Sequence, residues 1–136
     1  CALPFSVRLA PGKPEAVAHV ESGYLAVDGM LLLPGTGDVM KKRRLLMREG
    51  IIFVSLVLSG KGKFVAEPYI ATPGVLDMKE ERELLKEVGD ELMQIIESSR
   101  DTSDDRIHKV TRQTIRRIIG DYTGKNPPIE INVARV

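Results

Sequence analysis

Apolar and polar positions alternate in different ways along the second half of the chain. Residues 51–58 form a nearly uninterrupted apolar run, which is typical of a strand that is buried on both faces or lies at the centre of a sheet. A glycine-rich link follows, and a second strand over 63–70 should complete an antiparallel hairpin. Pro68 and the Pro73-Gly74 pair place that second strand near an edge, because proline cannot donate a ladder hydrogen bond.

Beyond this hairpin, apolar residues recur at helical spacing. Residues 78–98 should form a helix with a net acidic outer face, and Asp77 is suited to cap it. A polar break precedes a second, net basic helix that ends at Gly120 and Gly124. An alternating strand over 129–136 closes the chain. We therefore expect an α+β fold in which a three-stranded sheet is covered on one face by two helices and preceded by short strands.

The first fifty residues carry weaker signals. We expect two or three short strands before a turn at Asp28-Gly29, and a loop after the brief apolar run at 31–33. Asp38 would cap a short helix over 39–48 that stops at Gly50, although a strand and a single helical turn fit almost as well. No separate core is visible in the first forty residues, which therefore resemble edge strands that need a partner sheet.

Composition narrows the class of protein. The 136 residues are 43% hydrophobic and 29% charged, as in a globular domain, and 20 basic against 19 acidic residues leave a net charge of +1. With a net charge so close to zero, the protein has no overall electrostatic attraction to nucleic acid or to a membrane. Its apolar runs are too short to span a bilayer. The lone Cys1 cannot form an internal disulfide, which favours a cytoplasmic origin. Because the chain begins without Met, we expect a fragment of a longer protein.

Candidate chemistry is sparse. His19 and His108 stand alone, without the spacing that a zinc site or a nucleophilic triad needs, so we predict no catalytic and no metal-ligating residue. The glycine-rich link at 59–63 lacks the spacing of a phosphate-binding loop. Basic side chains are the remaining candidates for a binding function, because they could contact RNA phosphates. The alternative is that they simply form solvated helix faces. These candidates for RNA contact are Lys41, Lys42, Arg43, Arg44, Arg112, Arg116 and Arg117.

Several short motifs follow one another along the chain. In sequence, they are Gly23-Tyr24-Leu25-Ala26-Val27-Asp28-Gly29, Gly37-Asp38, Arg43-Arg44-Leu45-Leu46, Glu49-Gly50-Ile51, the strand at 51–58, Pro73-Gly74, and Lys125-Asn126-Pro127-Pro128-Ile129. Their order resembles the C-terminal region of ribonuclease J, a β-CASP member of the metallo-β-lactamase superfamily. The resemblance covers nearly the whole chain and rests on order and spacing, since each motif is weak alone.

The resemblance implies that residues 1–48 are the tail of a metallo-β-lactamase domain and that 49–136 form the C-terminal assembly domain. It implies a cytoplasmic parent enzyme that cuts RNA as a 5′→3′ exonuclease and as an endonuclease, with two zinc ions bound by motifs that precede this region. This module would hold a homo-oligomer together, most simply a dimer, and support the catalytic domains of its own chain. Two alternatives are a stand-alone RNA-binding module and a small regulatory α/β domain that binds a metabolite.

Overall fold

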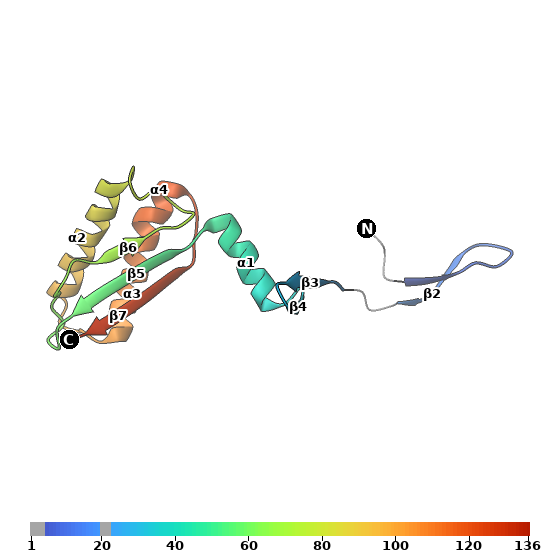
Figure 1. Ribbon diagram of the computed structural model, residues 1–136, viewed down its shortest axis with the longest axis horizontal. Coiled ribbons are helices and arrows are strands. Elements are labelled where there is room, and N and C mark those ends of the chain that lie inside the picture. Colours follow the sequence, from blue (N-terminus) through green and yellow to red (C-terminus); the bar gives the residue numbers. More distant parts are fainter. Residues whose placement is uncertain (1–4, 20–22) are drawn as a thin grey trace. The chain divides into compact units, whose positions relative to one another are not determined.

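A computed structural model describes residues 5–19 and 23–136 (Figure 1). Cys1, the basis of the expectation about cellular compartment, lies outside these residues. The chain divides into two compact units, Cys1–Lys42 and Arg43–Val136, which we call the N-terminal and C-terminal units.

The C-terminal unit is built on a three-stranded sheet with the order β6-β5-β7. Strand β5 (Ile52–Leu58) lies in the centre, antiparallel to β6 (Tyr69–Ala71) and parallel to β7 (Ile129–Arg135). The apolar run therefore forms the central strand and the alternating C-terminal run forms an edge strand. The central position of the apolar run and the edge position of β6 confirm the sequence prediction, which assigned no edge to the C-terminal strand.

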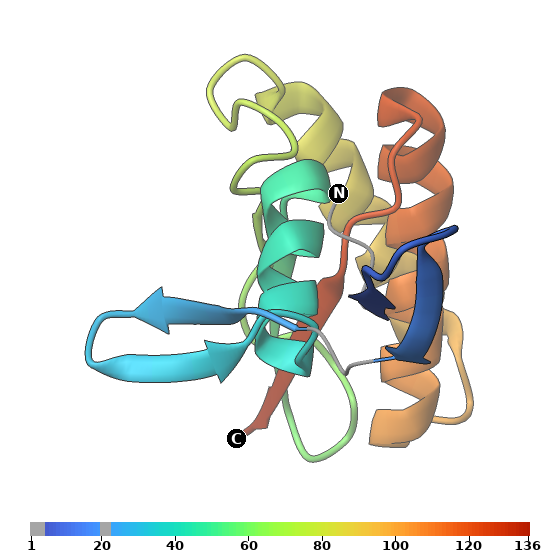
Figure 2. The same ribbon diagram turned by 90° about the vertical axis from the view of Figure 1, so that its right-hand side faces the viewer.

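Helices cover one face of this sheet (Figures 1 and 2). Helix α2 (Arg82–Ser98) packs on β6, and α3 (Asp104–Ile115) packs on β7 and on α2. The second helix continues through a π-helical turn, η1 (Arg116–Gly120), into the short α4 (Asp121–Thr123). The predicted α+β fold is thus confirmed.

Buried and more exposed side chains alternate along β5, so its apolar run is compatible with a sheet that is covered on one face only. Ile52, Val54, Leu56 and Leu58 are at most 1% exposed, whereas Phe53 on the opposite face is 44% exposed. The buried side chains pack against the helices, which contribute Val88, Leu92, Ile96, Ile107, Val110, Ile115 and Ile119. Each fully buried side chain of this size contributes roughly 1.5–3 kcal/mol. This core is the main source of stability of the unit.

Two predicted boundaries in this unit are wrong. The strand expected over 63–70 pairs with β5 only at residues 69–71, apart from one isolated bridge between Phe64 and Leu58. Between these contacts the chain is not paired with β5. Pro68 has no backbone N–H, so it cannot donate a hydrogen bond that would start the pairing earlier. The apolar spacing predicted that the first long helix begins at Met78, but α2 begins at Arg82.

Asp77 is not the cap of that helix. Its carboxylate accepts the N–H of Lys79 at 2.8 Å, and its carbonyl accepts the N–H of Glu81 at 3.0 Å. These bonds form a turn that precedes α2, because a carboxylate can bond to its own backbone two residues on as readily as it can cap a helix. At the other end of the helical pair, Gly124 ends α4 with φ +65°, whereas Gly120 lies within the π-helical turn.

The N-terminal unit contains two antiparallel hairpins. Strand β1 (Phe5–Arg8) pairs with β2 (Glu15–His19), and β3 (Leu25–Asp28) pairs with β4 (Leu31–Pro34). The apolar run at 31–33 is therefore part of a strand, held by the turn at residues 29–30. Helix α1 (Asp38–Glu49) follows and confirms the predicted short helix.

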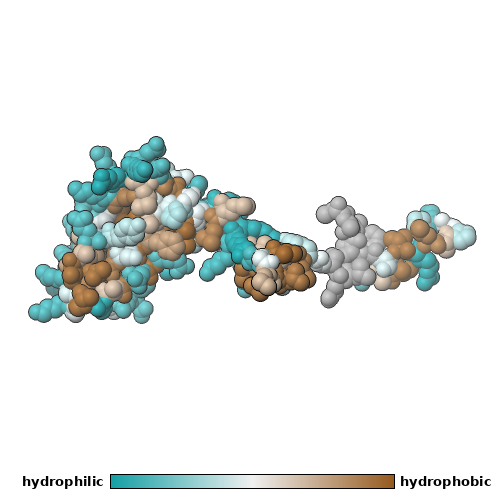
Figure 3. Space-filling view, viewed as in Figure 1, coloured by the Kyte–Doolittle hydropathy of each residue, from teal (hydrophilic) through white to brown (hydrophobic). Residues whose placement is uncertain are grey.

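Most apolar side chains of the hairpins are exposed to solvent. Figure 3 shows apolar residues on the surface of both hairpins. Val27 is 77% exposed, Leu31 61% and Leu32 65%. A sheet normally buries one apolar face against another layer, and no described residue of their own unit forms such a layer over these strands. The expectation that they need a partner sheet stays a prediction.

Candidate interaction surfaces

The basic residues singled out from the sequence lie on different elements. Lys41, Lys42, Arg43 and Arg44 are exposed on α1, and the Nζ atom of Lys41 lies 3.6 Å from the carboxylate of Asp38. Arg112 lies on α3, while Arg116 and Arg117 begin the π-helical turn; all three are exposed.

Arg117 is occupied by a structural contact. Its guanidinium forms an ion pair with Glu91, so it ties the π-helical turn to α2. A second contact joins α4 to the residue that precedes α2, where the Tyr122 hydroxyl donates a hydrogen bond of 2.9 Å to Glu81. That bond and the negative charge of Glu81 raise the pKa of Tyr122, because both disfavour the phenolate. The acidic and basic helices are therefore joined across their interface.

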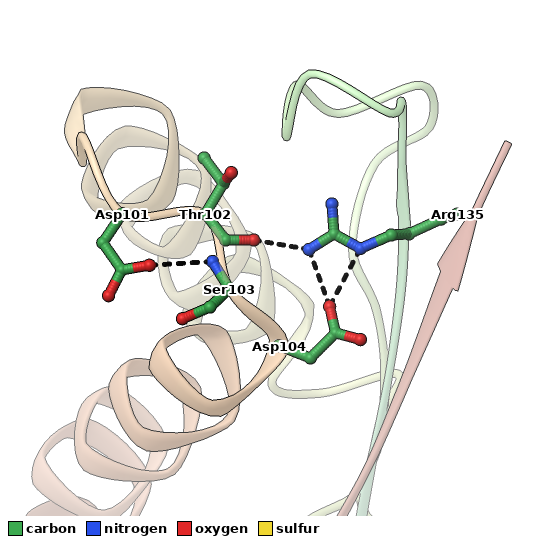
Figure 4. A network of polar contacts seen from close by, with 5 residues as sticks. All are labelled: Asp101, Thr102, Ser103, Asp104 and Arg135. Atoms are coloured by element: carbon green, nitrogen blue, oxygen red, sulfur yellow. Dashed lines mark hydrogen bonds and ion pairs between the residues drawn. The ribbon is translucent and has the colours of Figure 1, made fainter.

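Arg135 fixes the end of β7 to the connection between α2 and α3 (Figure 4). Its Nε and Nη2 atoms donate to one carboxylate oxygen of Asp104 at 2.9 and 2.6 Å, and Nη2 also donates to the carbonyl of Thr102. In the same loop the backbone N–H of Ser103 donates to Asp101 at 2.9 Å, which lowers the pKa of that carboxyl. Sequence reasoning missed this network, because Arg135 is more than thirty residues away from its partners along the chain.

A shallow groove of about 670 Å³ runs between the β6 edge and the start of α2. Its apolar lining includes Tyr69, Met78 and Leu85, and its charged lining includes both signs. Such a surface suits a polypeptide better than a strongly charged ligand, because its lining combines acidic and basic side chains. The charged residues of the groove are Glu67, Arg82, Glu83 and Lys86.

The described residues do not fit a two-zinc centre. Nowhere in residues 5–19 and 23–136 do three His, Cys, Asp or Glu side chains gather closely enough to hold a metal ion. His19 lies on β2 and His108 on α3, in different units. We therefore assign no zinc ligand among these described residues. The helices among the described residues are also too short or too polar to cross a bilayer.

The described residues thus form a small α+β domain, in which helices cover one face of the sheet while the other face and one edge are open. A comparison with family models places it: the model of the ribonuclease J C-terminal domain matches residues 38–136. The chain belongs to this family, which confirms the resemblance inferred from the order of motifs.

Curated relatives agree with this assignment. The chain is 25% identical to a ribonuclease J from Sinorhizobium meliloti over 134 residues, which cover 96% of this chain and 24% of the relative. It is 29% identical to a ribonuclease J 2 from Staphylococcus epidermidis over 118 residues, which cover 81% of this chain and 20% of the relative. The chain thus spans a quarter or less of the length of these proteins.

Proposed function

We propose that this chain is the C-terminal part of a cytoplasmic, metal-dependent ribonuclease, and that its role is to assemble subunits and support their catalytic domains. The family match over residues 38–136, together with a span of at most a quarter of the relatives' length, carries this proposal. In the parent enzyme, two zinc ions and the RNA substrate would be bound by other domains of the same polypeptide.

Residues 1–48 are proposed to complete the metallo-β-lactamase domain, and residues 49–136 to form the assembly domain. Exposed apolar strands support the first part, because Val27, Leu31 and Leu32 would be covered by the remaining strands of such a domain. A compact core supports the second part: the C-terminal unit buries its own apolar residues and still offers an open sheet edge.

The test compares the full-length enzyme, the same enzyme ending at residue 48 of this numbering, and the 136-residue chain alone. Each is assayed on 5′-monophosphorylated RNA and sized by analytical ultracentrifugation. We expect the full-length enzyme to be an active oligomer, the truncated enzyme to be smaller and less active, and the 136-residue chain to be inactive. Nuclease activity in the 136-residue chain, or an unchanged oligomer after truncation, would contradict the proposal.

RNA contact by the basic residues is the second candidate function. Within the described residues, Arg112 and Arg116 are exposed one helical turn apart and have no ion-pair partner, which favours them as phosphate contacts. If they bind RNA, affinity should fall steeply with salt, and Arg112→Glu with Arg116→Glu should abolish it. If the affinity for RNA is negligible even at low salt, this function is excluded.

A further inference from the structure

The two edges of the sheet differ in how they are protected. Strand β6 has only three residues and lies between Pro68 and Pro73, so little of its backbone can pair with another chain. Strand β7 has seven residues, Ile129–Arg135, with no proline, glycine or bulge. Proteins usually protect such long edges, because an unpaired row of N–H and C=O groups is a template for another strand.

Hydrogen bonds at the ends of β7 show which backbone groups point outward. The N–H of Ile52 donates to the carbonyl of Pro128 at 2.9 Å, and the N–H of Val136 donates to the carbonyl of Leu58 at 2.9 Å. Successive residues of a strand direct their backbone groups to opposite sides. Even-numbered residues of β7 therefore bond to β5, whereas Ile129, Ile131, Val133 and Arg135 direct their N–H and C=O groups away from the sheet.

We infer that β7 pairs antiparallel with β7 of a second copy of this chain, around a two-fold axis at Asn132, which joins two three-stranded sheets into one. This inference deepens the proposed assembly function and rests on it. In an antiparallel ladder, two opposed residues exchange both of their backbone bonds. With the axis at Asn132, Ile131 lies opposite Val133 of the second copy and Ile129 lies opposite its Arg135. Every outward-directed residue of β7 then has a partner, so no other register pairs as much of the strand.

Side chains also fit this register. On the helix-covered face, Ile131 and Val133 are partly buried and pack against the core, and across the axis they would stack on each other and extend that core. On the open face, Asn132 would meet its own copy, and Glu130 would lie opposite Ala134. No two like charges are directly opposed in this arrangement, so the strand is complementary to itself.

Crosslinking tests the register directly. In a background with Cys1→Ser, which removes the chain's one cysteine, Asn132→Cys places two thiols opposite each other, within the Cα separation that a disulfide needs. The matched control, Glu130→Cys, places its thiol about 13 Å from its own copy, because four residues separate the two along paired strands. We expect mild oxidation to convert the first variant, but not the second, into a covalent dimer.

Proline tests the backbone. Val133→Pro removes an outward N–H while leaving the bonds to β5, and Val133→Ala truncates the same side chain but keeps the N–H. Sedimentation equilibrium should show self-association weakened about tenfold or more by proline relative to alanine, since about two backbone hydrogen bonds are lost per dimer. Their melting temperatures should be close. Because the crosslink does not depend on the proline variant, the inference stays testable if that variant fails to fold.

The outcomes separate the inference from the function on which it rests. A dimer of the unmodified chain that neither crosslinks at Asn132 nor responds to Val133→Pro overturns the pairing of β7 and leaves assembly intact. An unmodified chain that stays monomeric at millimolar concentration overturns both, since a single strand pair is a small interface but should still associate at that concentration.

Discussion

Gly50 offers a sharp test of how tightly the C-terminal unit is packed. It directly follows α1, is buried, and has φ +75°. A methyl group at its Cα would lie 2.6 Å from the carbonyl carbon of Gly74, 2.7 Å from the oxygen of that carbonyl, and 2.7 Å from Cγ2 of Val75. Real side chains do not approach backbone atoms so closely, so Gly50→Ala must move the loop at residues 73–75.

A matched control isolates this clash from backbone strain. Gly124 also has a positive φ, +65°, but a methyl group there would have nothing within 4 Å. The left-handed conformation costs a non-glycine residue about 1–2 kcal/mol, and forced overpacking adds about 1–3 kcal/mol. We therefore expect the free energy of unfolding to fall by about 2–5 kcal/mol in Gly50→Ala and by about 1–2 kcal/mol in Gly124→Ala.

Urea unfolding at 25 °C, followed by circular dichroism, measures both values. The additional loss in Gly50→Ala corresponds to a melting temperature lower by roughly 4–8 °C per kcal/mol for a unit of this size. The reasoning fails if the two variants are equally destabilised, because the contact with Gly74 would then cost nothing.

Three further predictions concern the core and the joined helices. Leu56→Ala, at a fully buried position of β5, should lower the free energy of unfolding by about 2–5 kcal/mol in the same urea assay. Arg117→Glu should destabilise by up to about 1 kcal/mol, as expected for an exposed pair, and Glu91→Arg in the same molecule should restore the loss; no rescue would mean that the ion pair is not formed. The contact with Glu81 raises the pKa of Tyr122 above its ordinary value, near 10. It therefore stabilises the fold fully below the ordinary pKa, and this stabilisation is lost as the pH rises through the raised pKa. Glu81→Gln should therefore lower the titration midpoint of Tyr122 in absorbance measurements at alkaline pH, and an unchanged midpoint would contradict the contact.

Strong apolar periodicity carried most of the fold prediction. The run at 51–58 has the length and composition of a buried strand, and the helical spacing at 78–98 and in the next helix determined which faces meet the sheet. Glycine positions marked where α1 and α4 end, because few other residues adopt a positive φ. These are local signals, and local signals determine element type well.

Features that depend on pairing with other parts of the chain could not be predicted from these local signals. The apolar run at 31–33 forms a strand because β3 pairs with it. The strand expected over 63–70 is shorter because, apart from the isolated bridge between Phe64 and Leu58, only residues 69–71 pair with β5. The π-helical turn at 116–120 has no spacing signature that separates it from an ordinary helix. Among the basic candidates, sequence could not distinguish Arg117, which pairs with α2, from Arg112 on the neighbouring turns.

Under the proposed pairing of β7, folding and assembly would use separate backbone groups of the same strand. The even-numbered residues of β7 give their backbone bonds to β5, and the side chains of Ile129 and Ile131 pack toward the helices, so folding does not depend on the outward N–H and C=O groups. A substitution that removes only an outward N–H should therefore reduce self-association without unfolding the domain, whereas a core substitution such as Leu56→Ala should reduce both. Because folding and the proposed pairing would use different groups, this interface could be gained or lost through a few changes on β7 while the C-terminal domain kept the same core.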